Sequence, residues 1–206
     1  MTQASMPVRA ATTLIVCRQG AAGAEVLMGQ RGAQAAFMAS KYVFPGGAVD
    51  PEDAEAAIPA LGRIGQACAA RLALHCAADA PSPGTLVAAG LRELQEETGL
   101  LLPPEATPLR FVFRAITPPG RSRRFDARFL IADGAALEGD SIGFAQASGE
   151  LSHLHWIGLD RARALDLPFI TEVVLAEVQA GLAGAADRGV PFFDNSTDRP
   201  TFRRLV

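Results

Sequence analysis

Three glutamates spaced along one short segment constrain this chain more than any other feature of its sequence. Glu93, Glu96 and Glu97 stand three and four residues apart, so in a helix they share one face instead of spreading around the cylinder. Their like charges repel each other by about 0.2 to 0.5 kcal/mol per pair, and in a last turn they also oppose the helix dipole. Hard cations such as Mg²⁺ and Mn²⁺ prefer oxygen ligands. The cluster therefore predicts a helix whose end holds a divalent cation.

The residues around the glutamates carry start and stop signals for a helix over 84–98. Ser82 followed by Pro83 is typical of a helix start, and Gly99 can take the left-handed conformation that ends one. The side away from the glutamates is apolar and repeats with helical spacing at Val87, Leu91 and Leu94. One face is thus expected to pack on a core, while the other stays available for chemistry.

An isolated acidic cluster is also typical of a solvated helix face, so its neighbours must decide between the two interpretations. Arg92 lies one turn before Glu96 and could brace its carboxylate. Upstream, Gly46 and Gly47 follow a short apolar strand, and paired glycines allow backbone amides to approach an anionic group closely. These neighbours favour a chemical site over a solvated surface.

The two segments together resemble the Nudix box, which combines a glycine, a glutamate and the run R-E-U-x-E-E-x-G-U, where U is aliphatic. Residues 92–100 match that run at every specified position, and on this resemblance the chain is identified as a member of the Nudix hydrolase superfamily. Asp53 occupies the place of the family's first glutamate and is one methylene shorter. More residues separate Gly47 from Arg92 than the family pattern allows, so an insertion of about residues 54–80 splits the box.

The inserted stretch is rich in alanine and is expected to be helical. Its larger apolar residues recur at helical spacing, namely Leu61, Ile64, Cys68, Leu72 and Cys76. Pro59, Gly62 and Gly65 argue against a single straight helix, so one or two amphipathic helices are predicted. A length of 206 residues favours one domain over 1–206 that carries this insertion. We expect the insertion either to cap the site or to extend a dimer interface.

Other segments are similar to a branch of the superfamily that includes the peroxisomal coenzyme A diphosphatases of animals and many bacterial relatives. An apolar strand ending at Arg31, followed by a loop and Phe44–Gly47, resembles the lead-in of that branch. Thr117–Pro119 and Arg124–Asp126 resemble a second segment of it. The resemblance implies metal-dependent hydrolysis of a diphosphate bond in a nucleoside diphosphate linked to another group, with coenzyme A or acyl-CoA as the favoured substrate.

The same resemblance implies a role for each residue of the site. Glu93 is the expected general base, and the expected catalytic set is Glu93, Arg92 and Glu96. The expected ligands of Mg²⁺ or Mn²⁺ are Glu93, Glu96, Glu97, Asp53 and Glu150. Asp53 and Glu150 rank second, because Asp53 is short and Glu150 competes with Glu138 and Asp140 for the role. The expected substrate contacts are Arg31, Gly46, Gly47, Arg123 and Arg124.

The order of apolar runs and helical segments predicts an α/β fold, an α/β/α sandwich of the Nudix type with a mixed sheet. Strands are expected near residues 8–18, 25–31, 42–46, 109–117, 123–132 and 152–158. A C-terminal helix is expected from about Pro168 to Leu182. The tail from Gly189 to Val206 is rich in phenylalanine, and we expect it to pack on the chain's own core or on the second subunit of a homodimer.

Charge and cysteine content narrow the partners and the compartment. A net charge of −3 argues against a nucleic-acid backbone as a partner, and no run of eighteen apolar residues indicates a membrane span. Cys17, Cys68 and Cys76 form no CxxC pair, which indicates a reducing compartment. Because the sequence carries neither a signal peptide nor a peroxisomal C-terminal address, a cytoplasmic protein acting on a small nucleotide-type substrate is expected.

Alternatives to this function stay open at the level of sequence. ADP-ribose, dinucleoside polyphosphates and oxidised nucleotides are alternative substrates for the same chemistry. A Nudix-fold module that binds a nucleotide without cleaving it belongs to a different class. The intact Glu93, Glu96 and Glu97 argue against it, because such modules commonly lose box carboxylates. An isomerase on the same fold would need a further catalytic motif, and the sequence offers none that we can identify.

Overall fold

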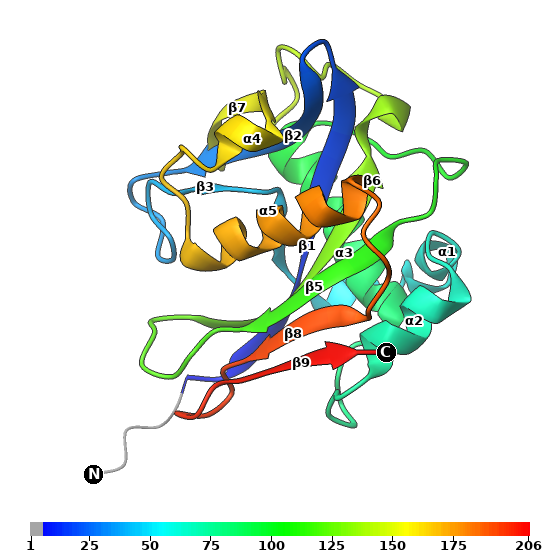
Figure 1. The fold of residues 1–206 in the computed structure, drawn as a ribbon, viewed down its shortest axis with the longest axis vertical. Helices are drawn as coiled ribbons and strands as arrows, with labels where there is room; N and C mark the ends of the chain where they lie inside the picture. Colours follow the sequence, from blue (N-terminus) through cyan, green and yellow to red (C-terminus); the bar gives the residue numbers. More distant parts are fainter. Residues whose placement is uncertain (1–5) are drawn as a thin grey trace.

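The described part of the chain, residues 6–206 in a computed structural model, is built around one mixed sheet (Figure 1). The strands along its main path lie in the order β3-β2-β1-β6-β5-β8-β9, while β4 pairs with β1 and β7 pairs with β2. Their bounds are β1 Val8–Gly20, β2 Gly23–Arg31, β3 Tyr42–Val43, β4 Gly46–Ala48, β5 Arg110–Ile116, β6 Arg124–Asp133, β7 Leu151–Gly158, β8 Val190–Asp194 and β9 Thr201–Leu205.

Helices cover both faces of this sheet, which confirms the predicted α/β class with a mixed sheet (Figure 1). One layer contains α1, α2 and α3, and the other contains α4 and α5. The helix bounds are η1 Pro51–Ala54, α1 Ala57–Leu61, α2 Gln66–Ala73, α3 Pro83–Thr98, η2 Gly134–Ala136, α4 Leu159–Ala162 and α5 Phe169–Leu182. No helix among residues 6–206 is long and apolar enough to cross a bilayer.

Strand β1 separates the two apolar cores, because successive side chains of a strand point to opposite faces. Leu14 and Val16 pack with α3, whereas Ile15 and Cys17 pack with α5. Strand β1 runs parallel to β6 and antiparallel to β2. This central position brings the α3 layer, the β4 loop and the α5 layer close to the same stretch of β1.

Helix α3 forms where the sequence predicts it and is capped at both ends. The Ser82 hydroxyl accepts the amide of Thr85 at 3.1 Å, and Gly99 adopts φ 73° while its N–H donates to the Gln95 carbonyl at 2.8 Å. Close packing of α3 on the sheet needs Gly90, because a Cβ there would lie 2.8 Å from a methyl group of Thr12. The predicted helix over 84–98 is therefore confirmed.

The predicted strand near 42–46 is interrupted, and the tail contains strands that the sequence did not reveal. Two short strands, β3 and β4, replace the single run, because Pro45 has no N–H to donate to a ladder and Gly46 adopts a positive φ. In the tail, β8 pairs in parallel with β5, and β9 pairs with β8. The tail thus extends the chain's own sheet, which was the first of the two expected alternatives.

The segment over 54–80 contains two short helices, α1 and α2, as its periodicity predicts. Ala60, Ile64 and Leu72 are buried in the core beneath α3. Helix α1 approaches α3 so closely that a Cβ on Gly84 would lie 2.1 Å from the carbonyl oxygen of Ala57. The segment therefore packs as part of the α3 layer. That it is an insertion in a single domain remains our prediction.

Candidate active site

The buried carboxylate of Glu97 lies against the backbone of strand β4. The amide of Gly46 donates to Oε2 of Glu97 at 2.8 Å. No other residue fits at position 46, because a Cβ would lie 2.6 Å from both the carbonyl oxygen of Thr12 and the Cα of Thr13. The glycine pair was expected to let an amide approach an anion, and in the structure that anion is a glutamate of α3.

Arg92 is the hub that fixes the acidic side chains. Its guanidinium donates to Asp53 at 2.9 and 3.1 Å, to Glu93 at 3.0 Å, to Glu96 at 2.9 Å and to the carbonyl of Ala48 at 3.0 Å. The hydrogen bond with Asp53 is the main reason why the pKa of Arg92 is raised. Arg92 therefore keeps its charge and acts by positioning, and the predicted contact with Glu96 is confirmed.

Asp53 holds Arg92 rather than facing the open site. Its side chain is only 3% exposed. One oxygen accepts from Nε of Arg92, and the other accepts from Nη2 and from the amide of Asp50 at 2.8 Å. Both oxygens are engaged, so the structure corrects the metal-ligand role predicted for Asp53. Its role here is to orient the arginine that orients the glutamates.

Glu93 projects between Arg92 and strand β4. Gly47 makes room for it, because a Cβ at Gly47 would lie 2.2 Å from Oε1 of Glu93. Burial raises the pKa of Glu93, Arg92 opposes that shift, and the negative charges of Glu96 and Glu150 add to it. The carboxylate is thus held in place by one cation but crowded by further negative charge.

Glu97 experiences the same crowding more strongly because it is almost fully buried. Burial, reinforced by the charges of Glu93 and Glu150, raises the pKa of Glu97 to about 8, although the hydrogen bond from Gly46 and the charge of Arg31 oppose the shift. A buried carboxylate with too little compensating charge favours a proton or a cation. This residue therefore marks the point where a cation would be most strongly attracted.

The other carboxylates of the region differ in their position. Glu96 is 54% exposed and is paired with Arg92. Glu150 lines the same cavity as Glu93 and Glu97, and the loop before it is tied to α3 because Ser148 N–H donates to the Glu96 carbonyl at 2.9 Å. Asp140 instead accepts amides of its own loop. Glu138 pairs through its backbone with Leu101 and does not line the cavity, so Glu150 is the one of the three competing carboxylates that lines it with Glu93 and Glu97.

The donor chemistry fits a hard divalent cation, although the ligands are not gathered into a finished centre. Within residues 6–206, no three His, Cys, Asp or Glu side chains converge closely enough to hold a metal. Glu93 and Glu97 nevertheless present partly desolvated oxygens that repel one another. Mg²⁺ usually takes one or two carboxylates together with substrate phosphates and water. Two crowded glutamates beside an open cavity match that pattern.

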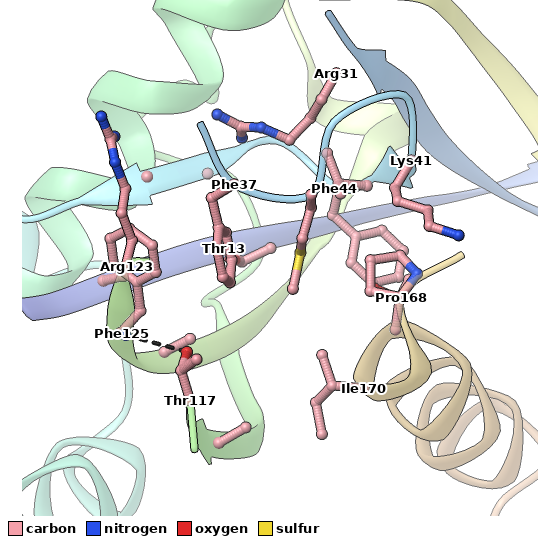
Figure 2. Close-up of a pocket in the computed structure, with 18 of the residues that line it drawn as sticks. Thr13, Arg31, Phe37, Lys41, Phe44, Thr117, Arg123, Phe125, Pro168 and Ile170 are labelled. Atoms are coloured by element: carbon pink, nitrogen blue, oxygen red, sulfur yellow. Dashed lines mark hydrogen bonds between the residues drawn. The ribbon is translucent and has the colours of Figure 1, made fainter. Parts of the chain in front are cut away.

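A cavity of about 1010 Å³ opens beside Glu93, Glu97 and Glu150 on the α5 side of the sheet. Its floor contains three alanines on adjacent strands, since Ala127 of β6 pairs with both Ala11 of β1 and Ala115 of β5. Figure 2 shows the side chains around it, with Arg123, Phe37 and Phe125 grouped at one side and Phe44, Pro168 and Ile170 at the other.

Three cationic side chains at the cavity have no acidic partner. Arg31, Arg121 and Arg123 line it, and none of them forms an ion pair with a carboxylate of residues 6–206. Figure 2 shows Arg31 and Arg123 extending toward the same side of the cavity. Free guanidinium groups beside crowded carboxylates suit a substrate that carries several phosphate oxygens.

Arg124 does not belong to this set, which corrects its predicted substrate contact. It is buried, and its guanidinium donates to the carbonyls of Thr117, Asn195 and Ser196 at 3.0 to 3.2 Å. It ties the start of β6 to the end of β8. Neighbouring Arg121, which belongs to the same basic cluster of the sequence, lines the cavity instead.

The loop before β3 and the loop before β6 meet over the cavity, and the sequence did not predict this contact as part of the site. Phe37 and Phe125 pack edge to face with ring centroids 5.2 Å apart, and Ser122 donates to the Ala36 carbonyl at 3.2 Å. Phe37 and Phe125 lie far apart in the sequence, and only the fold brings them together. No residue of 54–80 lines the cavity, so the expectation that this segment caps the site is not met.

Solved structures with the same fold are Nudix proteins. A Nudix hydrolase from Alicyclobacillus acidocaldarius is 28% identical, with a TM-score of 0.63 over 89% of this chain and 95% of that one. A MutT protein from Methanosarcina mazei Go1 is 15% identical, with a TM-score of 0.54 over 87% of this chain and 99% of that one. The Nudix domain of Shewanella oneidensis NrtR, solved in complex with ADP ribose, is 13% identical, with a TM-score of 0.52 over 85% and 89%.

The comparisons with protein-family models and with curated proteins return no match. The class of protein therefore rests on the fold, on the solved structures and on the acidic helix end. Together they support the Nudix superfamily, and the enzyme class that they define is a Nudix hydrolase, a pyrophosphohydrolase acting on phosphorus-containing anhydrides.

Proposed function

We propose that this Nudix hydrolase uses Mg²⁺ or Mn²⁺ to cleave the diphosphate bond of a nucleoside diphosphate linked to another group. One observation carries the proposal, namely that the crowded carboxylates of α3 and three unpaired guanidinium groups line a single cavity. In the reaction, water attacks one phosphorus and the bridging P–O bond breaks. The bridging oxygen leaves with the other phosphorus, so two phosphate monoesters are released.

Glu97 and Glu93 are the residues that would hold the cation, with Glu150 facing them and Glu96 joining once it leaves Arg92. A bound divalent cation supplies charge neutralisation on the phosphate oxygens and a lower pKa for bound water. Arg92, fixed by Asp53, keeps the α3 carboxylates in register. This division of roles explains why one carboxylate of the box is buried against an arginine while two others remain crowded.

Glu93 is our proposed general base. It lies beside Arg92, which fixes its direction, while burial makes its carboxylate a better proton acceptor than a solvated one. The phosphate oxygens are proposed to be bound by Arg31, Arg121 and Arg123. Guanidinium groups form paired, charge-assisted hydrogen bonds with phosphate, which is a more specific geometry than the point charge of a lysine offers. Each of these roles belongs to a side chain that lines the cavity.

For the substrate we propose coenzyme A and its acyl derivatives, as the sequence resemblance implies. ADP-ribose is the main alternative, because the Nudix domain of S. oneidensis NrtR was solved with it. Dinucleoside polyphosphates and oxidised nucleotides are further alternatives. The homodimer and the cytoplasmic location that the sequence suggests stay predictions.

The test is turnover of a panel that contains coenzyme A, acetyl-CoA, ADP-ribose, a diadenosine polyphosphate and nucleoside triphosphates, with Mg²⁺ or Mn²⁺ and products identified by mass. Glu97→Gln is the inactivating variant, and Glu105→Gln is the matched control, because Glu105 is exposed and does not line the cavity. We expect metal-dependent cleavage of coenzyme A to phosphopantetheine and an adenosine bisphosphate by wild type and by the control. Binding of a nucleotide without any cleavage would instead indicate a non-catalytic Nudix module.

A further inference from the structure

One end of the cavity is apolar and has no role in binding phosphate. It lies toward the start of α5, where Leu167, Phe169 and Ile170 line it together with Phe44 and Phe129 of the apolar cluster on the α5 side. Figure 2 shows Phe44, Pro168 and Ile170 at this end, across the cavity from Arg123 and Phe125. The cation there, Lys41, is paired with Asp166. A substrate that filled the cavity would therefore meet charge at one end and hydrocarbon at the other.

The hollow exists because small side chains coincide on three neighbouring strands. Ala11, Ala127 and Ala115 lie side by side in the register of β1, β6 and β5. Two residues further along β6, Phe129 pairs with Thr13 and Phe113, so large rings return. Protein interiors are normally close-packed. A row of alanines between rows of larger residues thus leaves space above it. The alanine side chains are too short to fill that space, but a ligand can.

Phe169 is the residue that this hollow leaves uncovered. It begins α5 and is 70% exposed, although Leu167 and Phe44, which line the same cavity, are buried. A single exposed aromatic residue on a surface is ordinary. Here, however, the ring lines a cavity that is continuous with the crowded carboxylates Glu93 and Glu97, so a ligand bound at those carboxylates can cover it.

We propose that the apolar end is a subsite for an aliphatic chain carried by the group on the far side of the diphosphate, so that the substrate is an amphipathic diphosphate. This inference rests on the proposed function and deepens it by naming what the second group contains. The phosphates lie between Glu97 and the guanidinium groups, and the chain lies over the alanine floor against Phe169 and Ile170. Burying the chain removes apolar surface of both ligand and Phe169 from water.

The test uses adenosine 5′-diphosphate alkyl esters with methyl, butyl and octyl chains, in which only the chain length changes. Each is expected to be cleaved to AMP and an alkyl phosphate. Burial of a methylene corresponds to a factor of about four in affinity, so kcat/KM should rise roughly two- to fourfold per methylene until the subsite is full. The increase in kcat/KM should come from a lower KM at an unchanged kcat, because the chain binds equally in the ground state and the transition state.

Two variants and a matched control locate the effect. Phe169→Ala and Ile170→Ala should each reduce the ratio of octyl to methyl ester kcat/KM by about tenfold, the order of the loss of one buried apolar side chain. Phe202→Ala removes an aromatic ring that is 59% exposed on β9 and does not line the cavity. That control should keep the wild-type ratio.

The dissociation constants of non-hydrolysable methylene-bridged esters, measured in parallel, separate failure of the inference from failure of the proposed function. If no ester is cleaved but affinity still rises with chain length and falls in Phe169→Ala, the subsite exists and the hydrolase proposal is wrong. If the esters bind or turn over with no dependence on chain length, or if Phe169→Ala and Phe202→Ala behave alike, the subsite is refuted.

Discussion

Two arginine–carboxylate networks lie in this molecule, and they differ in which charge is in excess. In the first, Arg114 and Arg128 share the single carboxylate of Asp126 at 2.7 and 3.0 Å, and all three are largely buried. In the second, Arg92 faces Asp53, Glu93 and Glu96, with Glu97 beyond them. The first network has surplus positive charge and the second has surplus negative charge.

The surplus is absorbed differently in each network. Arg114 also donates to the carbonyls of Leu74 and His75, and Arg128 donates to the sulfur of Cys76 at 3.4 Å. That network therefore ties the loop after α2 to the sheet, and none of its three side chains lines the cavity. We call it the closed network. The network of Arg92 instead opens on a cavity, and its carboxylates outnumber the one guanidinium group that they share. The comparison indicates that a network supports chemistry where its excess charge faces space that a ligand can enter.

Removing the excess charge at the open network should have the largest effect on activity. Glu97→Gln keeps an acceptor for the Gly46 amide but removes a proposed metal ligand, so kcat/KM should fall by about a thousandfold or more, the order found when a principal electrostatic contact to the transition state is lost. Steady-state kinetics at saturating Mn²⁺ measures it. A loss of less than tenfold would place the cation elsewhere.

Removing the shared carboxylate of the closed network should instead lower stability. Asp126→Asn leaves two buried guanidinium groups without their counter-charge, which typically costs about 3 to 5 kcal/mol, and here the partial exposure of Asp126 favours the lower part of that range. Urea unfolding followed by circular dichroism gives the free energy of unfolding. The variant that stays folded should keep its kcat. A stable variant with low activity would reverse the roles assigned to the two networks.

A smaller effect is expected where the open network is only repositioned. Asp53→Asn weakens the hold on Arg92, and kcat should drop by about ten- to a hundredfold, as for partners that orient metal ligands. Asp53→Glu restores the charge and should recover part of the loss. The readout that a purely structural role would not move is the concentration of Mn²⁺ needed for half-maximal activity, which should rise in Asp53→Asn and not in Asp126→Asn.

The smallest expected difference between the two networks is in how the free energy of unfolding depends on pH. The pKa of Glu97 is about 8 in the folded protein against 4.5 ordinarily, so between these values the folded state holds more protons than the unfolded state. The free energy of unfolding of the metal-free protein should therefore fall as pH rises from about 5 to 8. The slope should flatten in Glu97→Gln, whereas the arginines of the closed network do not titrate in this range. Urea midpoints at several pH values in EDTA measure this dependence. An unchanged slope in Glu97→Gln would contradict the claim that burial and neighbouring negative charge raise the pKa of Glu97.

The part of the site that depends on local spacing could be predicted from the sequence. Glu93, Glu96 and Glu97 share one helix face because of their separation alone, and Ser82 and Gly99 mark the helix ends by their own backbone preferences. The α/β order also follows from periodicities that are local. These features need no knowledge of which distant segments meet.

The part that depends on long-range partners could not be predicted. Asp53 was expected to approach a metal, but it pairs with an arginine on another element. Arg124 was grouped with Arg123, yet contacts with the Asn195–Ser196 turn, which lies far along the chain, bury it. The alanine floor of the cavity follows from the register of three strands, and no single stretch of sequence contains that register.

The measurement that tests the central claim most directly is Mn²⁺ binding followed by the electron paramagnetic resonance signal of the free ion, with and without AMP. The described carboxylates are not gathered into a finished centre, so wild-type affinity should be weak alone and at least tenfold tighter with AMP, while Glu97→Gln should lose most of that binding. Equal binding by wild type and Glu97→Gln, with or without nucleotide, would contradict the claim that the excess charge of α3 forms the metal site.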